Sequence, residues 1–191
     1  MEGIRTVKVK VAAYVHPSRA GDVPQGVHEI LNSLLLRFNE QFEGVILAYL
    51  SPKLVGHTAK ILSGLNPYFH VTLTAKLLLF SPAPGMKIEG KVNKIEKDYI
   101  GVVVLGLFNT TIGVDDIRDD LEYSTTHHLG RAWISKIDNR HIIELASLIR
   151  FSVKSLQETE HIIDICGSLS DNDTGSVDWL DQHSFRSRNK G

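Results

Sequence analysis

The sequence has one cysteine, few aromatic residues and no long apolar run. A single Cys166 excludes an intramolecular disulfide, and in "HIIDICGSL" it is typical of a small apolar residue in a strand. The apolar run from Ile100 to Phe108 is interrupted by glycines and is far shorter than the roughly 18 to 20 residues of a membrane helix. No charged start precedes an apolar stretch, so we expect neither a secretory signal nor a membrane partner. These absences favour an intracellular, reducing compartment.

Neither sign of charge dominates, because 21 basic residues face 22 acidic ones. The total therefore gives no indication of nucleic-acid or anionic-membrane binding. The distribution is uneven: residues 1–83 carry 8 basic and 5 acidic side chains (net +3), whereas residues 84–170 carry 10 and 13 (net −3). A 191-residue chain that is 42% hydrophobic has room for one large or two small globular domains.

The first 82 residues predict one helix packed on a small sheet, an α+β arrangement. "TVKVKVAAYV" alternates apolar and charged side chains, as a half-buried strand does. An amphipathic helix follows, which we expect Gly44 to end. "VILAYLS" and "YFHVTLTAKLLLF" then predict two further strands, so the expected order is strand, helix, strand, strand. The apolar face of the predicted helix consists of Val27, Ile30, Leu31, Leu34, Leu35 and Phe38.

Residues 83–170 predict an all-β barrel of the five-stranded OB type, which begins after the proline-rich boundary "SPAPG". "MKIEGKVNKIEK" alternates and then slips by one residue at Ile95, which predicts a bulge where the strand bends around the barrel. The run from Ile100 to Phe108 predicts one strand that is either buried on both faces or closes a small barrel, with a short strand near Thr111 to Val114 after it. "IRFSVKSL" and "HIIDICGSL" predict a hairpin around "QETE".

Two segments carry weaker patterns. Residues 115–146 form a long acidic insertion, in which we expect Trp133 and Ile134 to pack on the barrel. Residues 171–191 predict a polar, partly disordered tail, with Trp179, Leu180 and Phe185 as its sizeable anchors. The expected domains are therefore 1–82, 83–170 and a tail at 171–191.

No arrangement of residues indicates catalysis, a cofactor or a metal. A Gly-x-Ser-x-Gly motif is absent, and the histidines have no ligand partners at metal-binding spacing. The aspartates between residues 115 and 120 lie in a hydrophilic stretch and are typical of a solvated surface. We therefore expect no catalytic residue, no metal site and no cofactor.

Nucleic-acid contact is the one site hypothesis that the residues support. Lysines cluster on the first barrel strand, and OB barrels bind single strands through basic grooves with exposed aromatic rings. The alternative is that these lysines are a solvated edge that protects the strand from mispairing. The candidate contact residues for RNA or a partner are Lys91, Lys94, Tyr99, Phe108 and Asn109.

The stretch "PYFHVTLTAKLLLFSPAPGMKIEGKVNKIEKDYIGVVVLGLFNTTI" resembles the joint between the two domains of the RNA polymerase I stalk subunit family. "FSP", "GKVNKI" and "IGVVVLGLFNTTI" carry most of the resemblance, which extends from about Val7 to Leu169. One departure is Ala146, which stands where the family pattern usually has glycine. The family is the polymerase I counterpart of the larger stalk subunit of the archaeal polymerase and of the seventh-largest subunit of polymerase II.

The resemblance implies a non-catalytic subunit of DNA-directed RNA polymerase I in the nucleus and nucleolus. It implies a tip domain that docks on the polymerase core subunits, an OB domain that projects outward and a smaller stalk partner. Docking of the polymerase I initiation factor, and contact with nascent single-stranded RNA, are further expectations. The alternatives are a stalk subunit of polymerase II or III and a free-standing OB-fold RNA-binding module.

Overall fold

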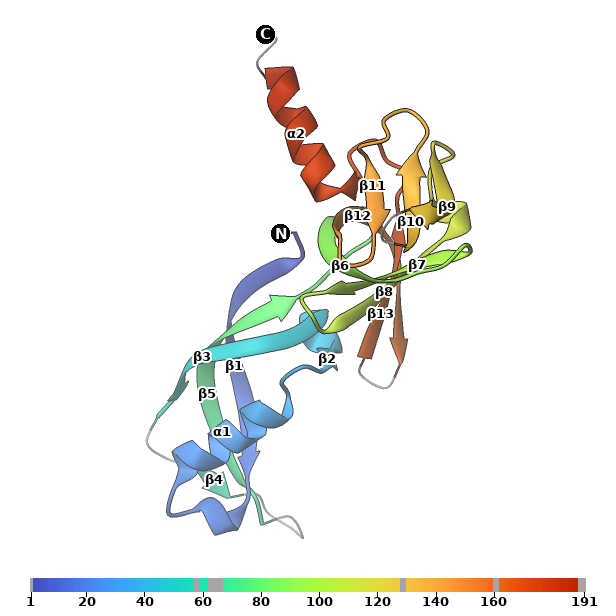
Figure 1. Ribbon diagram of the computed structural model, residues 1–191. Coiled ribbons are helices and arrows are strands. Elements are labelled where there is room, and N and C mark those ends of the chain that lie inside the picture. Colours follow the sequence, from blue (N-terminus) through green and yellow to red (C-terminus); the bar gives the residue numbers. More distant parts are fainter. Residues whose placement is uncertain (1, 57–58, 62–66, 128–129, 160–161, 189–191) are drawn as a thin grey trace. The chain divides into compact units, whose positions relative to one another are not determined.

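The computed structural model describes residues 2–56, 59–61, 67–127, 130–159 and 162–188 (Figure 1). The chain divides into two compact units. One is Ile4–Ser81, called here the N-terminal domain, and the other combines Met1–Gly3 with Pro82–Gly191, called here the C-terminal domain. None of the described helices is both long enough and apolar enough to cross a bilayer.

The N-terminal domain contains an antiparallel five-stranded sheet. Its strands lie in the order β1, β5, β3, β2, and the short β4 pairs with β5. The alternation of apolar and polar residues in β1 and β5 places one face of each strand in the core. The bounds are β1 Ile4–Val15, β2 Phe38–Asn39, β3 Gly44–Leu54, β4 Lys60–Ile61 and β5 Phe69–Phe80.

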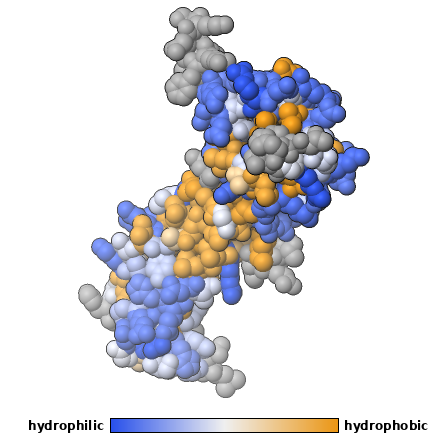
Figure 2. All heavy atoms as spheres, viewed as in Figure 1, coloured by the Kyte–Doolittle hydropathy of each residue, from blue (hydrophilic) through white to orange (hydrophobic). Residues whose placement is uncertain are grey.

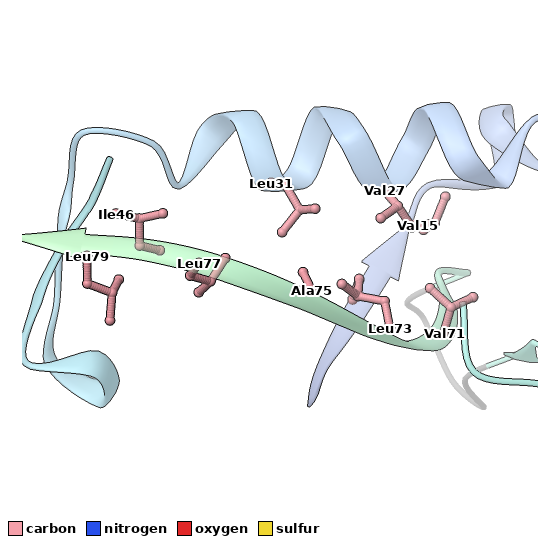
Figure 3. Packing of buried hydrophobic residues seen from close by; sticks show 10 residues of the cluster. Val15, Val27, Leu31, Ile46, Val71, Leu73, Ala75, Leu77 and Leu79 are labelled. Atoms are coloured by element: carbon pink, nitrogen blue, oxygen red, sulfur yellow. The ribbon is translucent and has the colours of Figure 1, made fainter. Parts of the chain in front are cut away.

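Helix α1 (Val23–Ser33) covers one face of this sheet (Figure 1). Asp22 caps its start by accepting a hydrogen bond from the Gln25 backbone N–H at 3.1 Å. Val27 and Leu31 point from the helix toward the sheet (Figure 3), where buried side chains of β5 meet them. Since each buried aliphatic side chain contributes roughly 1.5–3 kcal/mol, this contact holds the domain together.

Helix α1 ends at Ser33, earlier than the apolar periodicity predicts. Leu36 adopts a left-handed φ of +60°, and its N–H donates to the Ile46 carbonyl at 2.8 Å. This hydrogen bond turns the chain back along the sheet, so Phe38 lies in β2 opposite Val45 and does not extend the helix. The connections around the helix include two short 3-10 turns, η1 (Pro17–Arg19) and η2 (Glu40–Phe42).

The C-terminal domain contains the closed five-stranded barrel that the sequence predicts. Its strands are β6 (Lys87–Ile95), β7 (Tyr99–Val104), β8 (Phe108–Gly113), β12 (Leu148–Thr159) and β13 (Ile162–Ser168). Adjacent strands pair in the order β13, β8, β7, β6, β12, and β12 pairs with β13 to close the ring. The β13–β8 pairing is parallel. The predicted bulge in β6 is present as a register shift between Val92 and Lys94.

The apolar run from Ile100 to Phe108 is a hairpin. Its first part, β7, is a barrel strand, whereas the prediction of one strand as far as Phe108, buried on both faces, was wrong. Leu105 (φ +54°) and Gly106 (φ +72°) make a tight turn, which the Leu107 N–H closes on the Val104 carbonyl at 3.0 Å. Positive φ at both central residues matches the right-handed twist of a hairpin. Ile100, Val102 and Val104 are buried, whereas the alternate residues face outward.

The acidic insertion contains a three-stranded antiparallel sheet in the order β11, β10, β9. Its bounds are β9 Leu121–His127, β10 Gly130–Ser135 and β11 Ile142–Glu144, after a 3-10 turn η3 at Val114–Asp116. Trp133 is buried and its indole N–H donates to the Glu96 carbonyl at 3.3 Å. Trp133 therefore packs on the barrel as expected, while Ile134 is only half-buried.

The segment after the barrel holds β14 (Gly175–Ser176) and helix α2 (Val177–Arg188), where the sequence led us to expect only partial order. Strand β14 pairs with β12. The Trp179 ring lies between the rings of His141 and His183, with both centroid distances at 4.1 Å, and its N–H donates to Asp138 at 3.1 Å. The β14–β12 pairing thus attaches this segment to the barrel, and Trp179 attaches the first turn of α2 to the insertion.

Candidate nucleic-acid and partner interface

Four of the five predicted contact residues lie on the outer face of the three consecutive antiparallel strands β6, β7 and β8, called here the β6–β8 hairpin. In the strand register, Lys91 lies opposite Val103, and Val103 lies opposite Asn109. Residues in such cross-strand rows share one face of the sheet. Lys91 and Asn109 are exposed, so this row presents an ammonium group and an amide to solvent on one side of the barrel.

Lys94 and Tyr99 form a pair at the end of the same hairpin. The Lys94 ammonium lies 5.1 Å from the centre of the Tyr99 ring, within the range of a cation–π interaction. A hydrogen bond to Tyr99 raises the pKa of Lys94 above its ordinary value. Lys94 thus stays charged at neutral pH, beside a half-buried aromatic ring that can stack with a base.

Gly101 allows the strands to approach closely beneath this pair. A Cβ atom at Gly101 would lie 2.7 Å from Asn93 Oδ1 and 3.2 Å from Lys94 Cβ. Either contact would push the β6 side chains away from β7. The missing side chain at Gly101 therefore lets β7 pack closely against Asn93 and Lys94 of β6.

Phe108 departs from the expected site because its ring lies in the barrel core, with 7% of its surface exposed. It starts β8 at a position that alternates inward with Thr110 and Ile112, which are also buried. A base cannot stack on a ring that the barrel covers. Of the candidate residues, the structure therefore brings Lys91, Lys94, Tyr99 and Asn109 to the surface.

Arg131 joins the site from the insertion, and sequence reasoning missed it. Its guanidinium forms an ion pair with the exposed edge of Glu96, at 2.5 Å, next to the β6–β7 turn. The charge of Arg131 acts on Lys94, where it favours the neutral amine. A cation directly after Gly130 was the only signal in the sequence, and nothing there indicated that β10 would bring Arg131 to Glu96, which follows β6.

The remaining cations of the barrel are largely paired with carboxylates. Lys154 contacts Asp116 at 2.8 Å, and the hydrogen bond raises the pKa of Lys154. Arg150 contacts Glu89 at 2.7 Å, and Lys87 is paired with Asp173. Anion binding at these positions would have to break an ion pair. The outer face of the β6–β8 hairpin is consequently the better candidate for binding phosphate groups.

Comparisons with known proteins identify the family of the barrel. Residues 82–170 match the family described as "RPA43 OB domain in RNA Pol I". The chain is 28% identical over 159 residues to the "DNA-directed RNA polymerase I subunit rpa43" of Schizosaccharomyces pombe, covering 82% of this chain and 90% of the relative.

Two further relatives carry the same designation. The human "DNA-directed RNA polymerase I subunit RPA43" is 38% identical over 87 residues, which are 46% of this chain and 25% of the human protein. A "Probable DNA-directed RNA polymerase I subunit RPA43" of Dictyostelium discoideum is 22% identical over 181 residues, with 94% of this chain and 49% of the relative covered. Thus the chain spans most of the fission-yeast protein but only a quarter of the human one. Residues 82–170 thus match the OB domain of the RNA polymerase I subunit, and the similarity to the fission-yeast subunit covers most of this chain.

Proposed function

We propose that the chain is a non-catalytic stalk subunit of DNA-directed RNA polymerase I, located in the nucleus and nucleolus. The observation that carries this proposal is the similarity to the fission-yeast polymerase I subunit over 159 residues, which includes both domains. Because a subunit without an active site of its own works through contacts, the chain would support transcription of ribosomal RNA genes by joining the polymerase to other factors.

The two domains would divide these contacts. The N-terminal domain would dock on the polymerase core subunits as the tip of the stalk and would bind the smaller stalk partner. The C-terminal domain would project outward and offer its surface to the polymerase I initiation factor. Opposite net charges on the two halves of the sequence favour one orientation during encounter, although salt screens charges of this size.

Depletion of the chain in its own cells tests this assignment. Pulse labelling of new transcripts should show that synthesis of the ribosomal RNA precursor falls, while messenger RNA and transfer RNA synthesis continue in the same cells. Those two RNA classes serve as the internal control. A primary loss of messenger or transfer RNA synthesis would instead assign the chain to polymerase II or III.

We also propose that the outer face of the β6–β8 hairpin contacts nascent single-stranded RNA. The exposed Lys91 and the Lys94–Tyr99 pair support this, because they combine surface cations with an aromatic ring. Each phosphate contact releases a counterion, so the affinity should fall steeply with salt.

Fluorescence anisotropy with a labelled uridine 12-mer measures this affinity. The double variant Lys91→Glu/Lys94→Glu should bind about tenfold more weakly and with a flatter salt dependence. Lys136→Glu is the matched control, since Lys136 is an exposed lysine outside this face whose ammonium contacts the Asp119 carbonyl at 3.1 Å. Equal affinity of the double variant and the control would refute the assignment of this face.

A further inference from the structure

Strand β1 is an edge of the N-terminal sheet. Its twelve residues pair with β5 in one continuous register, and among the described residues no strand pairs with its other side. In an antiparallel pair, alternate residues direct their N–H and C=O groups away from the partner. About half of the β1 backbone groups are therefore available to a further strand.

One face of this edge is strongly basic. Lys8 lies directly opposite Lys76, and Lys10 lies opposite Thr74, which in turn lies opposite Lys53. All four lysines are exposed, and among the described residues no carboxylate pairs with them. Strands β1, β3, β4 and β5 contain no acidic residue at all. Because like charges directly across a sheet repel, an anionic partner would stabilise this face.

The opposite face of the same edge is apolar. Val7, Val9 and Val11 are only half-buried, although they point to the side of the sheet that α1 covers. Figure 2 shows apolar side chains on the N-terminal domain beyond the polar outer face of α1. A groove of about 440 Å³ opens there, and its lining includes Val9, Val11, Leu34, Phe42, Tyr49 and Leu77.

We propose that the β1 edge accepts an extended segment of another protein whose side chains alternate between acidic and apolar. Backbone hydrogen bonds would add this segment to the sheet as a sixth strand. Its acidic side chains would lie beside Lys8 and Lys10, and its apolar side chains would enter the groove beside Val9 and Val11. The two faces of β1 together thus specify the partner's pattern with a period of two residues.

A second copy of the chain and a purely protective edge both fit β1 less well. A second copy would place lysines against lysines, since the β1 edges of both copies carry the same charge. Edge lysines can also serve only to prevent mispairing, but protective edges are usually short or interrupted by bulges. Strand β1 is twelve residues long and has no register shift against β5.

This inference rests on the docking function proposed for the N-terminal domain and names the kind of segment that docks there. Peptide binding is measured on the 191-residue chain alone, so it can succeed or fail whether or not the chain assembles with a polymerase. The probe is a fluorescent nine-residue peptide that alternates glutamate and valine. Anisotropy gives its affinity, and hydrogen exchange reports on the β1 amides.

The peptide should bind the unmodified chain and slow hydrogen exchange of the outward-facing amides of β1. It should bind the Lys8→Glu/Lys10→Glu variant about tenfold more weakly. That variant removes the Lys8–Lys76 repulsion, so its fold is not at risk. The matched control Lys97→Glu, an exposed lysine of the other domain, should bind normally. A peptide of the same composition with its glutamates and valines in two blocks, and one with alternate backbone N-methyl groups, should both bind at least tenfold more weakly.

Three results would overturn the proposal. One is equal binding of the alternating and block peptides, which would indicate charge attraction alone. The second is binding without any slowing of amide exchange in β1. The third is that a uridine 12-mer, and not the peptide, loses affinity in the Lys8→Glu/Lys10→Glu variant, which would make the basic face a nucleic-acid surface.

Discussion

Replacing Ala146 by glycine should stabilise the C-terminal domain. Ala146 has a φ of +70°, in the left-handed region that side chains with a Cβ rarely adopt. Two hydrogen bonds to β6 hold it there: its N–H donates to the Val92 carbonyl at 2.9 Å, and the Val92 N–H donates to the Ser147 carbonyl at 2.9 Å. The backbone therefore cannot relax without breaking the contact between this turn and the barrel.

The size of the effect follows from two opposing contributions. The left-handed conformation costs a residue with a Cβ about 1–2 kcal/mol, which glycine avoids. Glycine in turn gives the unfolded chain more freedom, which costs about 0.4–1 kcal/mol. We expect a net gain of about 0.5–1 kcal/mol, or an increase of a few degrees, roughly 2–5 °C, in the melting temperature of a domain of this size.

Tryptophan fluorescence during thermal or urea unfolding measures this change, because both tryptophans, Trp133 and Trp179, lie in the C-terminal domain. Ala83→Gly is the matched control: Ala83 belongs to the same domain and has no positive φ, so its replacement should leave stability unchanged or lower it. If Ala146→Gly destabilises the domain as much as Ala83→Gly does, strain at this turn is not the reason for the glycine in the family pattern.

Three further substitutions or conditions probe the C-terminal domain. Thr110→Val should raise the free energy of unfolding by about 1 kcal/mol, because the buried Thr110 hydroxyl has no hydrogen-bond partner among the described residues, while the same change at the exposed Thr111 should have little effect. Trp179→Ala should cost about 2 kcal/mol and speed amide exchange in the first turns of α2, since the ring holds the helix against His141; unchanged exchange would contradict this. Burial lowers the pKa of His141 to about 4 from an ordinary 6.5. Between these two pH values the unfolded state binds more protons than the folded state, so the free energy of unfolding should fall as the pH is lowered from 6.5 to 4. The His141→Gln variant should show a flatter pH dependence.

The parts of the fold that the sequence predicted correctly depend on local alternation. The strand β6 and its bulge were indicated by the regular alternation, by its slip and by the neighbouring Gly90. In a strand, the local backbone determines the face to which each side chain points. The outward side chains Lys91 and Lys94 followed from the same alternation. For these residues, local structure and tertiary structure agree.

The wrong predictions concern segments whose structure is determined by pairing with distant residues or by an unfavourable backbone conformation. Leu36 and Leu105 both adopt positive φ, which leucine rarely does, so neither residue indicated a turn, and Gly106 alone was interpreted as part of a continuous strand. Phe108 was proposed as a contact residue because it stands at the polar end of the apolar run, but in β8 its ring points inward with Thr110 and Ile112. Arg131 reaches the site through pairings in the insertion, which the local sequence could not indicate.

The identity of the polymerase that carries this chain tests the account most directly. The tagged chain, expressed at its natural level, is purified from its own cells and the recovered proteins are quantified by mass spectrometry. We predict near-stoichiometric recovery of the RNA polymerase I core subunits together with a smaller stalk partner. Recovery of no polymerase core subunits, or of polymerase II or III subunits in their place, would contradict the account.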